Sequence, residues 1–166
     1  GMLTDTLGFR TNNMSARVLH SAASLLEKGA SLPEIYQKAL LRRSYQATLF
    51  WGSGLSNLQR EGRMVWTTLT MEARKQCGYG GRDDADLINV LSSVIDIDVA
   101  LIFVEQPDGM IKVSWRAPGD VDVSGVAQSF GGGGHRAAAG ATVEGPLIEA
   151  QERILKATRE LPLHNH

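Results

Sequence analysis

Several features that would assign a function class are scarce in this 166-residue chain. Its single cysteine, Cys77, cannot form an internal disulfide and has no second cysteine with which to build a thiolate metal site. Lysine and arginine number 17 against 18 acidic residues, so the positive excess of proteins that wrap long nucleic acids is missing. Any anionic ligand should therefore be small or short.

Long apolar runs are also lacking. None approaches the roughly 20 residues that a membrane span requires. The N-terminus has no basic stretch followed by an apolar one, which is the pattern of a secretory signal. We therefore expect a cytoplasmic protein without membrane association. Hydrophobic residues make up 43% of the chain and charged residues 21%, which is ordinary for a globular protein.

What the sequence does carry is a run of four glycines, Gly131, Gly132, Gly133 and Gly134, followed by His135 and Arg136. Core packing gives no evident reason for such a run, and a backbone without Cβ atoms can bring its N–H groups against a ligand. The histidine and the cation beside it could serve a phosphate or the polar edge of a nucleotide. The run therefore predicts an anion-binding or nucleotide-binding loop. The alternative is a flexible turn.

The flanks of the run narrow its interpretation. It is expected to join a short helix, beginning near Asp122 as N-cap, to a strand over 139–143. It is not a Walker loop, because no Gly-Lys-Ser/Thr follows. It is not a dinucleotide fingerprint either, because the glycines follow a helix instead of opening one.

Hydrophobic periodicity predicts a mixed α/β domain over the second half of the chain. Strands are expected over 64–70, 98–105, 110–117 and 139–143, and helices over 86–94, 122–130 and from 146 onward. A turn at 107–109 should join two of the strands in a hairpin. Helices over 14–28 and 31–43 precede the domain, the second with a capping box between Ser31 and Glu34. We expect a frayed C-terminal tail.

Alternation in the strand over 110–117 separates two kinds of residue. Ser114 and Arg116 alternate with Val113 and Trp115, so a hydroxyl and a guanidinium should project from the face opposite the apolar side chains. Close to the glycine run, they would suit a phosphate. The alternative is an ordinary solvated sheet face. Trp115 is expected in the core because its neighbours on that face are apolar.

Taken together, four segments of the sequence resemble a known family. They are TDTLGF at 4–9, DADLINVL at 84–91, VSWR at 113–116 and GGGGHRAAAGA at 131–141. They resemble the C-terminal part of a DHH phosphoesterase of the RecJ-like nanoRNase type. Such enzymes degrade very short RNA and dephosphorylate 3'-phosphoadenosine 5'-phosphate. The resemblance spans almost the whole chain.

The resemblance implies a two-lobed enzyme whose N-terminal lobe holds manganese on aspartates and histidines, and in which metal-activated water attacks the phosphoester. Asp5 would be a metal ligand, although Leu7 interrupts the usual Asp-Thr-Gly order. Residues 1–30 would be a helical remnant of that lobe, 31–61 a helical connector and 62–166 the DHH-associated, mixed-sheet substrate-binding domain. The defining Asp-His-His run is absent, so the missing N-terminal lobe would be a partner and this chain alone would be inactive. A homodimer is left open.

In the same resemblance, Ser114 and Arg116 would hold a phosphate or ribose, Gly131–Gly134 would offer N–H groups, and His135 and Arg136 would hold the scissile or terminal phosphate. Short RNA, short DNA, the adenosine bisphosphate and cyclic dinucleotides all remain candidates. One alternative is a single-stranded nucleic-acid-binding module like those of exonucleases and alanyl-tRNA synthetases, although the sequence shows no basic track or exposed aromatics for a longer strand. Another is a regulatory domain with a vestigial glycine loop.

Overall fold

The chain divides into two compact units, Gly1–Ser44 and Tyr45–His166. The computed structural model describes residues 2–6, 8–9 and 14–164, apart from the side chain of Asp5. The division between the units lies inside the segment that we expected to be a connector. Among the described residues, no helix is both long and apolar enough to cross a membrane.

The first unit is helical. It contains α1 (Met2–Asp5), α2 (Ala16–Glu27), α3 (Leu32–Tyr36) and the π-helical segment η1 (Gln37–Leu41). Ser15 caps α2, because its hydroxyl accepts the N–H of Val18 at 3.4 Å. The capping box predicted at the start of α3 was wrong: among the described residues, the Ser31 side chain makes no capping hydrogen bond. Pro33 lies in the first turn and lacks an N–H group, which removes one of the donors that Ser31 could accept.

The second unit begins with α4 (Tyr45–Ser56), a helix that the sequence left undefined because Gly52 and Gly54 interrupt its pattern. Gly54 is buried where the helix meets the sheet and α6 (Leu87–Leu91). A Cβ atom at Gly54 would lie 2.6 Å from Leu87 Cδ2 and 3.0 Å from Leu69 Cδ2. The glycine therefore allows an approach that a larger residue would prevent.

Within the described residues, one six-stranded sheet has the order β1-β2-β3-β4-β6-β5. The strands are β1 (Gln59–Glu61), β2 (Met64–Leu69), β3 (Val99–Glu105), β4 (Met110–Arg116), β5 (Gly133–His135) and β6 (Ala138–Glu144). Strands β2 and β3 are parallel, whereas the other neighbouring pairs are antiparallel. This confirms the mixed α/β class with flanking helices and the predicted hairpin between β3 and β4.

Besides α4, three elements of the second unit were not predicted. The short strand β1 has three exposed residues and therefore no apolar pattern. Strand β5 lies within the glycine run, where the sequence indicated only a loop. Helix α5 (Met71–Cys77) did carry signals, because the Thr70 hydroxyl accepts the Ala73 N–H at 3.1 Å and Gly78 ends the helix in the left-handed conformation.

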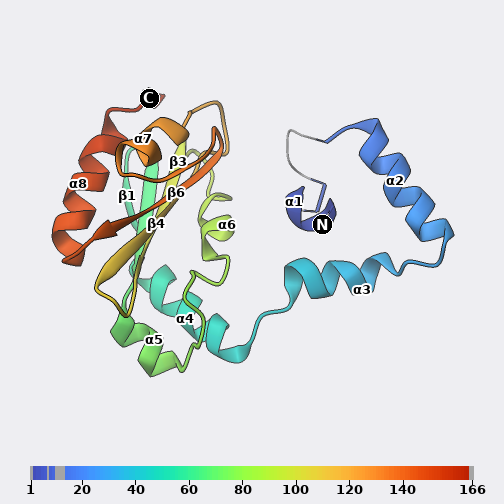
Figure 1. The fold of residues 1–166 in the computed structure, drawn as a ribbon, viewed down its shortest axis with the longest axis horizontal. Helices are drawn as coiled ribbons and strands as arrows, with labels where there is room; N and C mark the ends of the chain where they lie inside the picture. The colour runs from blue at the N-terminus through green and yellow to red at the C-terminus, as the bar shows by residue number, and fades with distance from the viewer. Residues whose placement is uncertain (1, 7, 10–13, 165–166) are drawn as a thin grey trace. The chain divides into compact units, whose positions relative to one another are not determined.

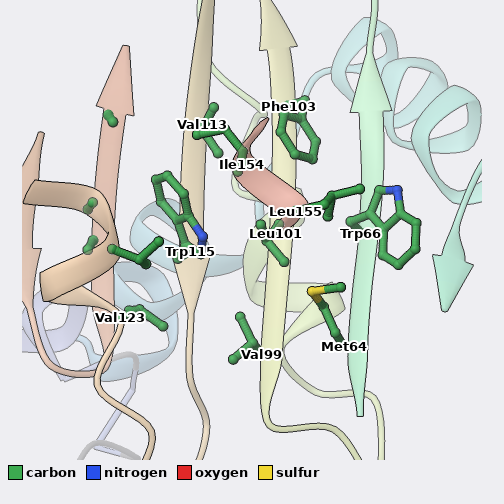
Figure 2. Close-up of a cluster of buried hydrophobic side chains, with 14 of the residues drawn as sticks. Met64, Trp66, Val99, Leu101, Phe103, Val113, Trp115, Val123, Ile154 and Leu155 are labelled. Carbon is green, nitrogen blue, oxygen red and sulfur yellow. The ribbon is translucent and has the colours of Figure 1, made fainter. Parts of the chain in front are cut away.

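One apolar cluster lies on each face of the sheet. On one face, α7 (Ser124–Ser129) and α8 (Leu147–Arg159) pack on a large cluster that includes Trp115, Leu101 and Ile154 (Figure 2). On the other face, α4 and α6 pack against β2 and β3; Figure 1 shows α6 and α8 on opposite sides of the sheet. Trp115 is fully buried, as predicted, and its Nε1–H group donates to Thr158 Oγ1 at 3.1 Å.

The start of α7 differs from the prediction. Its N-cap is Val123, not Asp122, because the helix begins at Ser124. The Asp122 carboxylate instead accepts two hydrogen bonds from Ser124, from the N–H at 2.9 Å and from the hydroxyl at 2.6 Å. Asp122 therefore still stabilises the start of α7, although it lies one residue before the N-cap.

Candidate functional site

The candidate residues of β4, β5 and β6 meet on one face of the sheet. Strand register pairs Ser114 with Gly140 and Gly140 with Gly133; in the next row it pairs Arg116 with Ala138 and Ala138 with His135. Directly paired residues point to the same side of a sheet. Two rows that cross three strands therefore lie on the face opposite Trp115. The structure thus brings four of the predicted residues together, namely Ser114, Arg116, Gly133 and His135.

This part of the sheet forms an open shelf next to α6. The helix buries Leu87, Ile88 and Leu91 against the same face, where it contacts β3 and β4. The residues of β4, β6 and β5 on this face are half-buried or exposed, and we call this area the shelf. It consists of Lys112, Ser114 and Arg116 of β4, Ala138, Gly140 and Thr142 of β6, and Gly133 and His135 of β5.

Arg116 is the half-buried cation of the shelf. One of its terminal nitrogens, Nη1, donates to the Trp115 carbonyl at 3.0 Å. Burial lowers the pKa of Arg116, while the nearby carboxylates of Asp84 and Asp86 act in the opposite direction. An arginine remains protonated at any physiological pH. The shelf therefore presents a permanent positive charge whose immediate neighbours are acidic.

The two aspartates come from the turn that leads into α6. Asp84 accepts the Ile88 N–H at 3.0 Å, and burial raises the pKa of its carboxyl. Ala85 and Asp86 both adopt left-handed backbone angles, with φ of 51° and 66°. Non-glycine residues in this region typically cost about 1–3 kcal/mol each, and they cluster at functional sites.

Sequence reasoning did not identify Asp84 and Asp86 as neighbours of Arg116. The segment DADLINVL contributed to the family resemblance, but only the packing of α6 beside β4 shows that its acidic residues lie near the shelf. Paired aspartates before a short apolar helix were the available signal. By themselves they indicate only a helix start.

Three of the four glycines in the run are required by the fold, so the expectation that packing needs none of them was wrong. Gly131 has a φ of 73° and Gly134 a φ of 147°, both of which favour glycine. A Cβ atom on Gly132 would overlap the carbonyl oxygen of Gly140, and one on Gly134 would overlap that of Ala138. The close approach of β5 to β6 therefore explains Gly132 and Gly134, and the left-handed backbone explains Gly131.

The N–H groups of the run are also partly occupied. The Gly131 N–H donates to Gln128 at 3.0 Å and the Gly132 N–H to Ala127 at 2.9 Å, and these bonds end α7. Gly131 and Gly132 therefore do not offer free amides to a ligand.

Arg136 lies in the two-residue turn between β5 and β6, outside the paired rows of the shelf. Its Nε donates to the Asp120 carbonyl at 3.1 Å, and its Nη2 donates to the same oxygen. The Arg136 carbonyl in turn accepts the Val123 N–H at 2.9 Å. The side chain is exposed but is tied to the loop before α7.

The predicted metal ligand, Asp5, belongs to the first unit. Its backbone ends α1, and its side chain lies outside the described part of the structure. Beside it, the Thr6 hydroxyl donates to the Met2 carbonyl at 2.7 Å and accepts the Phe9 N–H at 2.9 Å. Among the described residues, no group of three or more histidine, cysteine, aspartate or glutamate side chains could hold a metal ion.

Comparison with known proteins identifies the family. Residues 78–161, just over half of the chain, match the model of the DHHA1 domain. The chain belongs to the DHHA1 family. The DHHA1 match contains every residue of the shelf, and it confirms the resemblance to DHH phosphoesterases that the glycine–histidine segment indicated.

Curated relatives of this DHHA1 chain include two proteins described as "Bifunctional oligoribonuclease and PAP phosphatase NrnA". The protein from Thermus thermophilus is 36% identical over 163 residues, covering 96% of this chain and 48% of the relative. The protein from Mycoplasma genitalium is 29% identical over 143 residues, covering 86% and 44%. The chain thus spans about half the length of the curated relatives it matches.

Among solved structures, the DHHA1 chain is similar to an exopolyphosphatase-related protein from Bacteroides fragilis. The TM-score is 0.88 at 28% sequence identity, and the match covers 96% of this chain and 48% of that one.

Proposed function

We propose that the shelf binds the phosphate and nucleoside groups of a short oligoribonucleotide or of a nucleotide such as 3'-phosphoadenosine 5'-phosphate. It would be the substrate-binding part of a metal-dependent, RecJ-like phosphoesterase. The observation that carries this proposal is the strand register, which gathers Arg116, Ser114 and His135 around Gly133 and Gly140 on one face of the sheet. The names of the curated relatives supply the substrate class.

The charge of the shelf supports a phosphate near Arg116. Its guanidinium is half-buried, so a phosphate would meet it in an environment where charge-assisted hydrogen bonds are stronger than in water. Ser114, in the adjacent row of the same face, adds a hydroxyl donor. Asp84 and Asp86 oppose the close approach of further anions, which favours a ligand with few phosphates over a polyanion.

The described residues do not by themselves form a manganese site. We therefore propose that the metal is held mainly by the additional length of polypeptide that the relatives possess, with Asp5 contributing one ligand. We expect negligible hydrolysis by the present chain alone. Clear manganese-dependent turnover by pure material would contradict that expectation.

Titration calorimetry tests the binding proposal directly. The ligands are a 5'-phosphorylated RNA dinucleotide and 3'-phosphoadenosine 5'-phosphate. Arg116→Ala should weaken binding by about tenfold or more, because a hydrogen bond to a charged group contributes about 1.5–3 kcal/mol. Arg136→Ala should have a smaller effect, because its guanidinium is engaged by the Asp120 carbonyl.

Arg159→Ala is a suitable control for these titrations. Arg159 is exposed on α8 and pairs with Glu61 at 2.8 Å, away from the shelf residues. It should leave the affinity unchanged. Equal affinities for the wild type and Arg116→Ala would contradict the proposal. Affinity that keeps rising with strand length, instead of reaching a plateau within a few nucleotides, would favour the single-stranded nucleic-acid-binding alternative.

A further inference from the structure

The turn that leads into α6 is held by a tryptophan of α4. The indole Nε1–H group of Trp51 donates to the Ala85 carbonyl at 2.9 Å, across 34 residues of sequence. Ala85 is only 8% exposed, so its carbonyl has little access to water. A buried carbonyl that loses its donor is left unsatisfied, which is costly. The bond is therefore a tertiary restraint on this turn.

The restrained carbonyl belongs to the peptide group that joins Ala85 to Asp86. Both residues have left-handed backbone angles, and the orientation of the peptide between them depends on ψ of Ala85 and φ of Asp86. The preceding peptide is also fixed, because the Ala85 N–H donates to Asp83 Oδ1 at 3.0 Å. Strained backbone of this kind persists only where surrounding contacts determine it. The Trp51 indole supplies one of those contacts.

The turn determines where two carboxylates lie relative to Arg116. Asp84 is bonded to the Ile88 N–H at the start of α6. Asp86 is the N-cap residue, but within the described part of the chain its side chain makes no capping hydrogen bond. The direction of its carboxylate therefore depends on its own backbone angles. Because α6 packs beside β4, a change in those angles would move negative charge at the shelf.

We infer that Trp51 is a positioning residue of the shelf, whose indole N–H keeps the turn over 84–86 in the form that holds two carboxylates beside Arg116. This inference rests on the proposed function and adds to it the residue that maintains the selection of ligands with few phosphates. Without the indole donor, the Ala85 carbonyl would turn toward water and the strained pair would relax. The carboxylates would then move away from the guanidinium.

Trp51→Phe in the full chain tests this inference, because it removes the N–H group and keeps an aromatic ring. Calorimetry at one ionic strength would compare RNA dinucleotides that carry a 5'-monophosphate or a 5'-triphosphate. The wild type should bind the monophosphorylated dinucleotide more tightly. In Trp51→Phe the ratio of the two affinities should shift several-fold toward the triphosphate. A merely structural role of Trp51 would weaken both ligands alike and leave the ratio unchanged.

Trp66→Phe is the matched control. The Trp66 indole N–H is buried and has no hydrogen-bond partner among the described residues, and its side chain belongs to the cluster on the opposite face of the sheet. The same chemical change there should leave the ratio at its wild-type value. A second control removes the charges themselves. In a protein with Asp84→Asn and Asp86→Asn, adding Trp51→Phe should not change the ratio, because no carboxylate remains to be positioned.

The outcomes separate this inference from the proposed function. An unchanged ratio in Trp51→Phe, or an equal shift with and without the two carboxylates, would overturn the inference and leave the proposed function intact. If Trp51→Phe does not fold, hydrogen exchange on the wild type decides the matter. The Trp51 indole proton should exchange far more slowly than a solvated one, and fast exchange would contradict the restraint. Failure of the wild type to bind either dinucleotide would overturn both.

Discussion

At the scale of single residues, Asp98 is a buried charge of the second unit with several partners. Its side chain is 5% exposed and accepts three contacts: from Arg63 Nε at 2.9 Å, from the His164 N–H at 2.6 Å and from His164 Nδ1 at 3.1 Å. Burial by itself would raise the pKa of Asp98, but these hydrogen bonds outweigh it and lower the pKa below its usual 3.8. The expectation of a frayed tail was therefore wrong as far as His164.

The lowered pKa predicts the sign of a pH dependence. Because folded Asp98 binds a proton more weakly than the unfolded chain does, it stabilises the fold above about pH 4, and this stability is lost as the pH falls through the folded pKa. Asp98→Asn should lower the free energy of unfolding near neutral pH by about 2–3 kcal/mol. Urea denaturation at neutral pH and near pH 3 measures both effects.

The variant and the wild type should differ in how much the free energy of unfolding falls between neutral pH and pH 3. The Asp98→Asn variant should lose less stability between the two pH values than the wild type, because it has no carboxylate to protonate at this position. His164→Ala should give a smaller loss at neutral pH, since its side chain is 66% exposed. An unchanged slope in Asp98→Asn would show that the carboxylate does not contribute.

Individual residues also show how far the sequence determined the site. The placement of Ser114 and Arg116 opposite Trp115 followed from strand alternation, which is a local property. The neighbours of Arg116, Asp84 and Asp86, depend on where α6 packs, and no local pattern contains that information. The glycine run stays a predicted binding segment. The fold explains Gly132 and Gly134 by the close approach of β5 to β6, which is a tertiary constraint that no local pattern contains.

At the scale of secondary-structure elements, α4 contains two glycines in contrasting environments. A Cβ atom on Gly54 would press on Leu87 and Leu69, whereas one on Gly52 would have no heavy atom within 4 Å. Gly52→Ala should stabilise the protein by up to about 1 kcal/mol through helix propensity. Gly54→Ala gains the same propensity but overpacks the junction with α6 and the sheet, at a cost of about 1–3 kcal/mol.

The difference between the two alanine variants isolates the packing effect. Both can be measured by chemical denaturation, and Gly54→Ala should be less stable than Gly52→Ala by about 1–3 kcal/mol. Equal stabilities would mean that Leu87 and Leu69 move aside without loss.

Elements whose apolar side chains follow a clear helical or strand periodicity were predictable from the sequence. Elements without such a pattern were not. Strands β3 and β4 and the turn between them were predicted within about one residue, because long apolar or alternating runs leave little choice of structure. Strand β5 has only the partner strand β6 to define it, since two of its three residues are glycines. Its assignment as a loop therefore reflects missing side-chain information, which no pattern analysis could supply.

At the scale of the whole molecule, the two units differ in how much apolar surface they bury. Both apolar clusters of the sheet consist of residues from Phe50 onward. Among the described residues of α2, none is buried, and Leu19 and Leu25 are 54% and 52% exposed. The first unit also contains an apolar pocket of about 240 Å³ lined by residues such as Phe9 and Leu26. Its internal packing is therefore weak.

This contrast predicts that residues 45–166 fold independently of the first 44. A shortened protein with these residues should unfold cooperatively at close to the midpoint of the full chain, because burial of apolar surface is the main source of stability. It should also bind the dinucleotide with unchanged affinity, since every shelf residue belongs to the second unit. Thermal unfolding and calorimetry on the two proteins measure these quantities.

Hydrogen exchange on the full chain examines the same contrast without truncation. Amides of α2 should exchange through low-energy local opening, whereas those of β3 and β4, in the buried centre of the sheet, should require opening close to the global free energy of unfolding. Equal protection in α2 and β3, or failure of residues 45–166 to fold, would mean that the first unit is part of the cooperative core. Its exposed leucines would then have to be covered by packing that the described residues do not provide.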